Sequence, residues 1–230
     1  MISFFAKYKR LIFGTVVVVF IGSMFFVSGQ VFSTKLDSVA EVGGKKISYQ
    51  RFTMQVNRAM SGLKDSGSEV NELMSRTVKQ EIFREMVIEE LLSQQGKELG
   101  LYVPDFEIAA EIQNTPQFRE GAAFSPRAYY QTIYREFQMS PPEYEEWRKQ
   151  ARLASKFKQF IYTAVKVTPA EAKEAYQAAG KNMKDFEKNR AAFSDELARA
   201  KFANIANYLL RQLTVRQEVK SYLEEREQGK

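Results

Sequence analysis

Aromatic and methionine side chains between residues 118 and 147 have the chemistry to hold another polypeptide chain. Tyr and Trp join an apolar ring to a polar tip, and Met repacks around varied partners. Core packing is an equally simple use of such side chains, and it is the better interpretation for most of them. Tyr129 and Tyr130 are neighbours in a predicted helix and cannot both face one core, so one of the two is expected at the surface. The candidate peptide-contacting residues are Phe118, Phe124, Tyr129, Tyr130, Tyr134, Phe137, Met139 and Trp147.

Groups for catalysis or metal binding are scarce in this sequence. The chain contains no cysteine and no histidine, which excludes disulfides, thiolate chemistry and the commonest metal ligands. Carboxylates occur in adjacent pairs, but adjacent positions on a helix point in different directions, so these pairs are solvated helix surface and not acid/base dyads. The pairs are Glu89/Glu90, Glu145/Glu146 and Glu224/Glu225. We therefore expect no catalytic residue, no metal and no cofactor.

The formal net charge of +6 is concentrated at one end of the chain. Lys7, Lys9 and Arg10 supply half of the excess, and no acidic residue precedes Asp37. Nucleic-acid binding needs a clustered basic face, which the remaining sequence does not offer. The composition thus argues against a nucleic-acid partner.

An uncharged apolar run follows the basic cluster, from residue 11 to residue 27. Its length suits a helix that spans a bilayer, and the basic residues before it place the N-terminus in the cytoplasm by the positive-inside rule. A cleaved signal peptide is the alternative, although bulky residues stand where a cleavage site needs small ones. Both interpretations export the rest of the chain. Apolar anchor residues include Leu11, Val16, Val19, Phe20, Phe25 and Phe26.

The remainder of the sequence has predominantly helical patterning. Residues 39–47 alternate around Gly43-Gly44 and predict a small β-hairpin, after which Ser48 is a suitable N-cap for a helix. Residues 62–68 resemble a loop in composition, and residues 70–99 predict a long helix with a very wide apolar face. Further helix starts are marked by Pro104, Ser125-Pro126, Ser140-Pro141 and Thr168-Pro169.

A last long helix is predicted for residues 182–213. Ala198, Phe202, Ile205, Leu209 and Leu213 recur at helical spacing and indicate a face directed at the core, followed by a frayed tail over residues 224–230. The predicted organisation is a cytoplasmic stub and transmembrane anchor over residues 1–32, a main domain over residues 36–180, and a C-terminal helix that completes the core over residues 181–230. The fold class is all-α, with a transmembrane helix and one hairpin.

The order of these elements resembles the N-terminal chaperone domain shared by the SurA and PpiD folding factors. The stretch from Val39 to Phe52 is similar to the family's opening hairpin and helix start, and residues 90–101 to its "LGL" helix end. Residues 115–144 are similar to its Pro-Phe, Gly-Phe and Ser-Pro series, and residues 167–176 to the helix before its parvulin domain. The run of apolar residues at the N-terminus favours the membrane-tethered members.

This resemblance implies an inner-membrane protein whose main domain lies in the periplasm and binds unfolded or nascent envelope proteins. No parvulin pattern follows Tyr176, so the resemblance implies a chaperone without prolyl isomerase activity. One alternative is a structural adaptor for a single folded partner, such as the translocon, and another is an isomerase. Exchange of the 182–213 helix between two copies, which would form a homodimer, is also left open.

Overall fold

The computed structural model describes residues 37–68 and 71–228. The predicted anchor, with its basic flank, lies outside these residues. Among the helices that the structure describes, none combines the length and apolar character needed to cross a bilayer.

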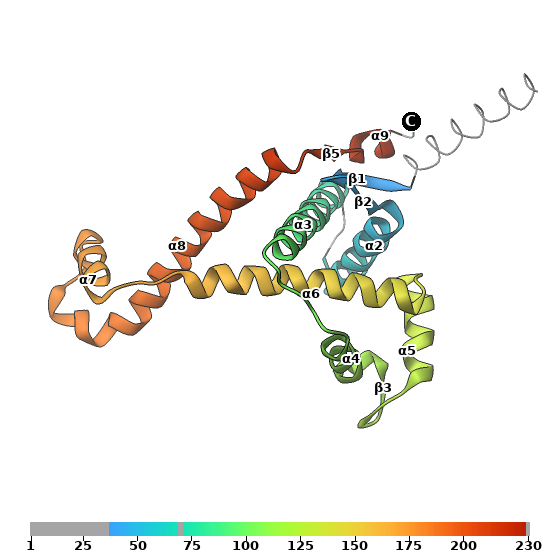
Figure 1. Ribbon diagram of the computed structural model, residues 1–230, viewed down its shortest axis with the longest axis horizontal. Helices are drawn as coiled ribbons and strands as arrows, with labels where there is room; N and C mark the ends of the chain where they lie inside the picture. The colour runs from blue at the N-terminus through green and yellow to red at the C-terminus, as the bar shows by residue number, and fades with distance from the viewer. Residues whose placement is uncertain (1–36, 69–70, 229–230) are drawn as a thin grey trace, which may run out of the picture.

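A small three-stranded sheet lies at one end of the molecule (Figure 1). The predicted hairpin is confirmed: β1 (Ser38–Val42) pairs antiparallel with β2 (Lys45–Ser48). Gly43 and Gly44 form its turn with φ of +56° and +81°, a conformation that glycine adopts without strain. The third strand, β5 (Val219–Ser221), pairs with the free side of β1 and brings the C-terminal segment back to the start of the domain.

Two helices follow the hairpin and pack against each other. The first, α2 (Tyr49–Asp65), begins as predicted, because the Ser48 hydroxyl accepts a hydrogen bond from the amide of Arg51 at 3.3 Å. It continues to Asp65, so the expectation of a loop from residue 62 was wrong at its start. The second, α3 (Glu72–Glu98), is the predicted long helix, with Asn71 as its N-cap.

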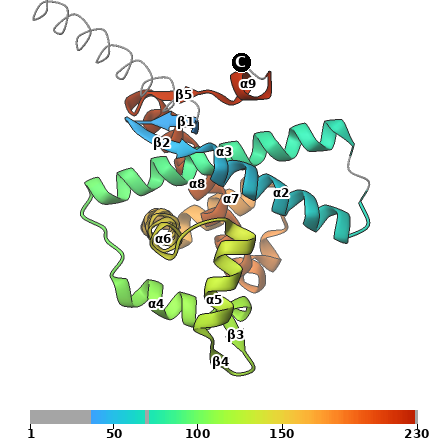
Figure 2. The same ribbon diagram turned by 90° about the vertical axis from the view of Figure 1, so that its right-hand side faces the viewer.

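The main core forms where α6 (Pro141–Ala164) crosses α3 (Figure 2). At the crossing, a Cβ added to Gly96 would lie 3.4 Å from the side chains of Leu153 and Phe157, so the two backbones approach closely. Buried side chains from the sheet, α2, α3, α6 and α8 complete this first cluster, including Val39, Ile47, Phe52, Leu91 and Leu213.

A second lobe lies on the other side of α6 (Figure 2). Its helices begin at the proline signals that the sequence carries: Ser125 and Ser140 cap helices whose first residue is proline. A short hairpin, which the sequence pattern did not predict, follows residue 118. The elements of this lobe are α4 (Asp105–Asn114), η1 (Pro116–Phe118), β3 (Arg119–Glu120), β4 (Ala123–Phe124), α5 (Pro126–Thr132) and the π-helical turn η2 (Ile133–Phe137).

Ion pairs fasten α4 to α6. Glu107 lies 2.6 Å from Arg152 and 2.5 Å from Lys156. Hydrogen bonds from Lys156 and Arg152 lower the pKa of the Glu107 carboxyl. One turn further along α4, Glu111 pairs with Arg148 at 2.5 Å. These contacts set the orientation of the second lobe relative to the helix that carries it.

The C-terminal third forms an arm that leaves the body and returns to it (Figure 1). It comprises α7 (Pro169–Ala178), capped as predicted by Thr168, then η3 (Met183–Asp185), the long helix α8 (Phe186–Arg216), β5 and α9 (Leu223–Glu227). Tyr176, Phe186 and Phe193 form a third small cluster at the tip of the arm.

Two expectations for this region need correction. The stripe on α8 does not face the core along its length, because Leu213 is buried while Ile205 is exposed. The frayed tail expected from residue 224 is replaced, as far as residue 227, by the short helix α9, which follows β5 and begins at the buried Leu223. Between α8 and β5, Glu218 adopts a left-handed φ of +45°. Strand pairing with β1, which is distant in sequence, explains why periodicity alone missed β5.

Candidate binding groove

The aromatic residues selected from the sequence build mainly the core of the second lobe. Phe118 is 0% exposed, and Tyr129 and Phe137 are also buried, so a peptide on the surface does not reach these three side chains. Phe124, Met139 and Trp147 are half-buried and pack against the same cluster. Most of this set therefore belongs to the core, which was the alternative interpretation of the sequence.

Rings in this cluster meet edge to face, the arrangement that aromatic quadrupoles favour. The Phe118 ring lies 5.1 Å from that of Tyr129 and 5.8 Å from that of Tyr144, at interplanar angles of 84° and 82°. The hydroxyl of Tyr129 donates to Glu145 at 3.1 Å, and burial raises the pKa of this hydroxyl. The cluster is therefore a packed core and not an open site.

Tyr130 and Tyr134 are the two members of the set that face solvent, at 50% and 59% exposure. The prediction that one of the adjacent residues Tyr129 and Tyr130 lies at the surface is confirmed. Because Tyr130 and Tyr134 are four positions apart at the junction of α5 and η2, they are neighbours on one surface. Their contact with a bound chain stays a prediction.

A half-buried ion pair lies near the junction between the two lobes. The Arg51 guanidinium lies 3.8 Å from the Glu89 carboxylate and packs over the ring of Trp147, 5.9 Å from its centroid. Burial raises the pKa of the Glu89 carboxyl and lowers the pKa of Arg51. This pair joins α2 to α3 beside the Trp147 ring of α6.

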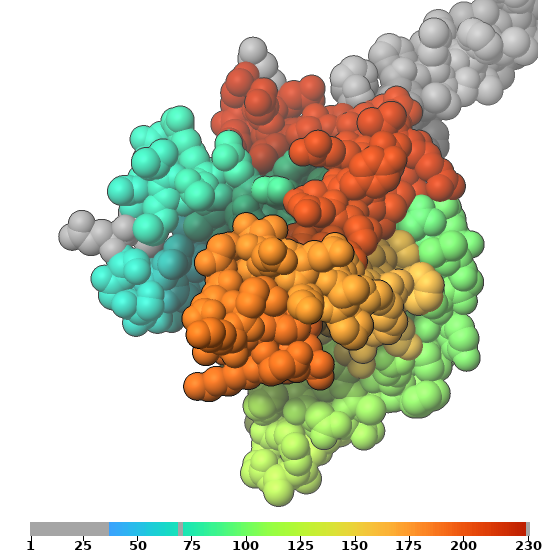
Figure 3. Space-filling model, turned by 90° about the vertical axis from the view of Figure 1, so that its left-hand side faces the viewer, coloured from blue at the N-terminus to red at the C-terminus, as the bar shows by residue number. Residues whose placement is uncertain are grey.

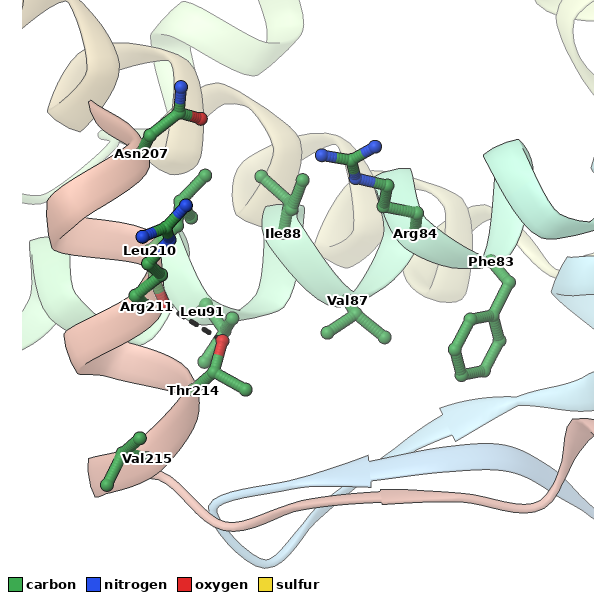
Figure 4. Close-up of a pocket in the computed structure, with 10 residues that line it drawn as sticks. All are labelled: Phe83, Arg84, Val87, Ile88, Leu91, Asn207, Leu210, Arg211, Thr214 and Val215. Carbon is green, nitrogen blue, oxygen red and sulfur yellow. Dashed lines mark hydrogen bonds between the residues drawn. The ribbon is translucent and has the colours of Figure 1, made fainter. Parts of the chain in front are cut away.

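An open groove of about 750 Å³ runs between α3 and α8. Figure 4 shows apolar side chains from both helices around it, with the sheet on the remaining side. In the space-filling view, a hollow separates the N-terminal half of α3 from the C-terminal arm (Figure 3). The lining residues are Phe83, Arg84, Val87, Ile88, Leu91, Asn207, Leu210, Arg211, Thr214 and Val215.

Both walls of the groove follow from the local sequence. Along α3, apolar positions at 83, 87, 88 and 91 widen the apolar face beyond what α2 and α6 cover. On α8, Leu213 is buried in the main core, and its neighbours Leu210 and Thr214 are thereby turned toward α3. The end of α8 is further fixed by an ion pair of 2.8 Å between Arg216 and Glu98.

The groove has the composition of a binding surface. Its volume falls within the range of about 300–1,000 Å³ typical of ligand sites, and its lining is mainly apolar. The Thr214 hydroxyl donates to the carbonyl of Leu210 at 2.8 Å, a contact within α8 itself. Within residues 37–68 and 71–228, no group of acidic side chains is arranged to hold a metal ion.

Reasoning from the sequence did not identify this groove. The wide apolar face predicted for residues 70–99 does not by itself tell whether other helices cover it. A better signal is that this apolar face is wider than the neighbouring helices can cover. The exposed Val215 at the end of α8 is a second signal.

A helical body that is closed by a C-terminal strand and leaves an apolar groove open has the build of a chain-binding module. The family model described as the SurA-like N-terminal domain matches residues 1–158. This chain belongs to that family.

Curated relatives agree with this assignment. The periplasmic chaperone PpiD of Escherichia coli K12 is 29% identical over 143 residues, which cover 60% of this chain and 22% of the relative. The periplasmic chaperone PpiD of Haemophilus influenzae is 25% identical over 226 residues, which cover 95% of this chain and 34% of the relative. The chain thus spans between about a fifth and a third of the length of these relatives.

Proposed function

We propose that this protein is a membrane-anchored periplasmic holdase, which binds unfolded or newly exported envelope proteins in the groove between α3 and α8. The observation that carries this proposal is the open apolar groove itself. The relatives in this family are periplasmic chaperones by name, and the apolar run at residues 11–27 supports a tether in the inner membrane.

Weak binding suffices for this role. Each apolar side chain that a client places in the groove contributes roughly 25 cal/mol per Å² of buried surface, and association costs offset much of that gain. A tether raises the effective concentration of the groove near the site where exported chains emerge. Modest affinity then allows release, which a holdase needs.

Tyr130 and Tyr134 form a second candidate contact on the opposite lobe. Both are exposed and present a ring with a polar tip, which suits transient contact with an unfolded chain. A client that occupies the groove and this tyrosine pair together would be held at two separated points, and such multivalent binding favours long unfolded segments over short ones.

The full chain in lipid nanodiscs provides the test. An unfolded outer-membrane protein is diluted from urea, and light scattering follows its aggregation with and without the holdase. Val215 lines the groove at 85% exposure, so Val215→Asp should weaken protection without affecting the core. Leu73→Asp is the matched control, because Leu73 lies on α3 outside the groove and is 74% exposed.

Protection by the wild type that Val215→Asp reduces and Leu73→Asp leaves intact would support the groove. Absence of protection at any excess of the wild type would remove the holdase proposal. Crosslinking in membranes then separates a holdase from an adaptor: many nascent chains indicate a holdase, and one stoichiometric partner, such as the translocon, indicates an adaptor.

We further propose that the protein lacks prolyl isomerase activity, and clear acceleration of a proline-limited refolding reaction would contradict this.

A further inference from the structure

The charges that border the groove are all positive. Among residues 37–68 and 71–228, the charged residues that line it are Arg84 on α3 and Arg211 on α8, one on each wall. Both are exposed, and neither has an ion pair or hydrogen bond with any residue that the structure describes. By contrast, Arg76, Arg152 and Arg216 each pair with a carboxylate.

The wall formed by α8 extends this positive character. Between residues 197 and 216 the helix carries Arg199, Lys201, Arg211 and Arg216, and no acidic residue. Two of these four are paired: Lys201 with Glu171 and Arg216 with Glu98, at 2.8 Å each. Arg211 therefore faces the groove without a neighbouring carboxylate on its own helix to neutralise it.

The geometry points to a selective groove: it takes apolar segments that carry an acidic side chain beside the apolar run, with Arg84 and Arg211 as the groups that recognise the carboxylate. This inference rests on the proposed function, since it names the class of client that the same groove prefers. An apolar floor buries the client's side chains, while a guanidinium on either wall can donate two parallel hydrogen bonds to a carboxylate.

A negatively charged bilayer surface is a less suitable occupant. The two arginines flank a concave space between helices, and Val87 and Leu91 lie within it. A flat bilayer reaches the rims of such a hollow but not its floor, whereas an extended or helical peptide segment fills it. Shape and charge together therefore favour an acidic-apolar peptide.

Three peptides that share one apolar run and differ only in two flanking positions provide the probe. The flanks are Asp, Asn or Lys, and fluorescence anisotropy measures the dissociation constant of each peptide with the full chain in nanodiscs of neutral lipid. Two exposed contacts of ordinary strength predict that the Asp peptide binds about three- to tenfold more tightly than the Asn peptide. The Lys peptide should bind most weakly of the three.

The double variant Arg84→Gln/Arg211→Gln should remove this difference and leave the Asn peptide unchanged. Arg199→Gln is the control, because Arg199 is exposed on α8 outside the groove lining and likewise has no ion pair with the described residues. High salt should also reduce the preference, since the screening length falls from about 10 Å at 0.1 M to about 3 Å at 1 M.

The outcomes separate the two proposals. If all three peptides bind equally, the groove stands as a client site and the charge selection is wrong. If none binds, the groove fails as a client site and the selection fails with it. If the preference survives in the double variant, or nanodiscs with anionic lipid bind through these arginines in place of the peptide, the assignment of Arg84 and Arg211 to peptide recognition is overturned.

Discussion

Replacement of Phe118 by alanine tests whether the aromatic set of the second lobe is core or client-binding surface. Phe118 is fully buried and makes edge-to-face contacts with Tyr129 and Tyr144. Truncation of a buried Phe typically costs about 3–5 kcal/mol, because apolar contacts are lost and a cavity remains. The cost should fall in the upper part of this range, since two aromatic contacts of about 0.5–1.5 kcal/mol each are lost as well.

The single tryptophan makes the assay straightforward. Trp147 packs against Phe137 and Tyr144 at the edge of the second cluster, with ring centroids 5.9 and 5.7 Å away. Its fluorescence therefore reports unfolding of this lobe, while circular dichroism reports the helices as a whole. Urea titrations followed by both probes give the change in the free energy of unfolding. Tyr130→Ala is the surface control, with an expected change of about 0.5 kcal/mol or less.

The two interpretations give opposite results. If the set is core, Phe118→Ala destabilises strongly, and at low urea the folded fraction still binds client with the affinity of the wild type. A Phe118→Ala variant that loses less than about 1 kcal/mol of stability, yet binds client far more weakly, would refute the structural argument. It would show that the ring is presented to clients and not to its neighbours.

Three further changes test other features. Gly43→Ala should destabilise the domain by about 1–2 kcal/mol in thermal denaturation, because a left-handed φ is strained for alanine. The added Cβ would also lie 2.5 Å from a side-chain oxygen. Nothing lies within 4 Å of a Cβ added at Gly44, so Gly44→Ala should cost less. Thr168→Ala removes the N-cap of α7 and should lower the local stability of this helix by about 1 kcal/mol. Faster amide hydrogen exchange in α7 would report this loss. Because the folded-state pKa of Glu107 is lowered, its ion pairs stabilise the fold above the unfolded-state pKa, and this stabilisation is lost as the pH falls through the folded-state pKa. Glu107→Gln should thus lower stability at pH 7 by less than about 1 kcal/mol, and urea titrations should show no difference in strong acid.

Features that depend on neighbouring residues were predictable from the sequence. The Gly43-Gly44 turn and the helix starts at Ser48, Ser125-Pro126 and Thr168-Pro169 each follow from local hydrogen bonding or fixed dihedral angles. Pairing of β5 with β1 was not predictable in this way, because a three-residue strand has no periodicity to detect.

The groove was hidden from the sequence for a related reason. Periodicity tells which side of a helix is apolar, but not whether another helix covers it. On α8 the apolar positions are evenly spaced, yet Leu213 is buried and Ile205 is exposed. The reason is that only the C-terminal end of α8 lies against the body, and the rest of the helix extends away from it. The same pattern therefore encodes a core contact at one end of the helix and an uncovered surface in its middle.

This arrangement explains how an apolar surface can stay open in a stable fold. α8 is fixed at one end by Leu213 in the main core and at the other by Phe186 and Phe193 in the arm cluster. Between these ends its aromatic contact with α6 is the edge-to-face pair of Tyr162 and Phe202, 5.4 Å apart. The buried members of the arm cluster come from α7 and α8 alone, so it is Leu213 and this aromatic pair that place α8 beside α3 and α6. The apolar side chains between α3 and α8 thus stay exposed, and exposed apolar surface is what the binding of unfolded chains requires.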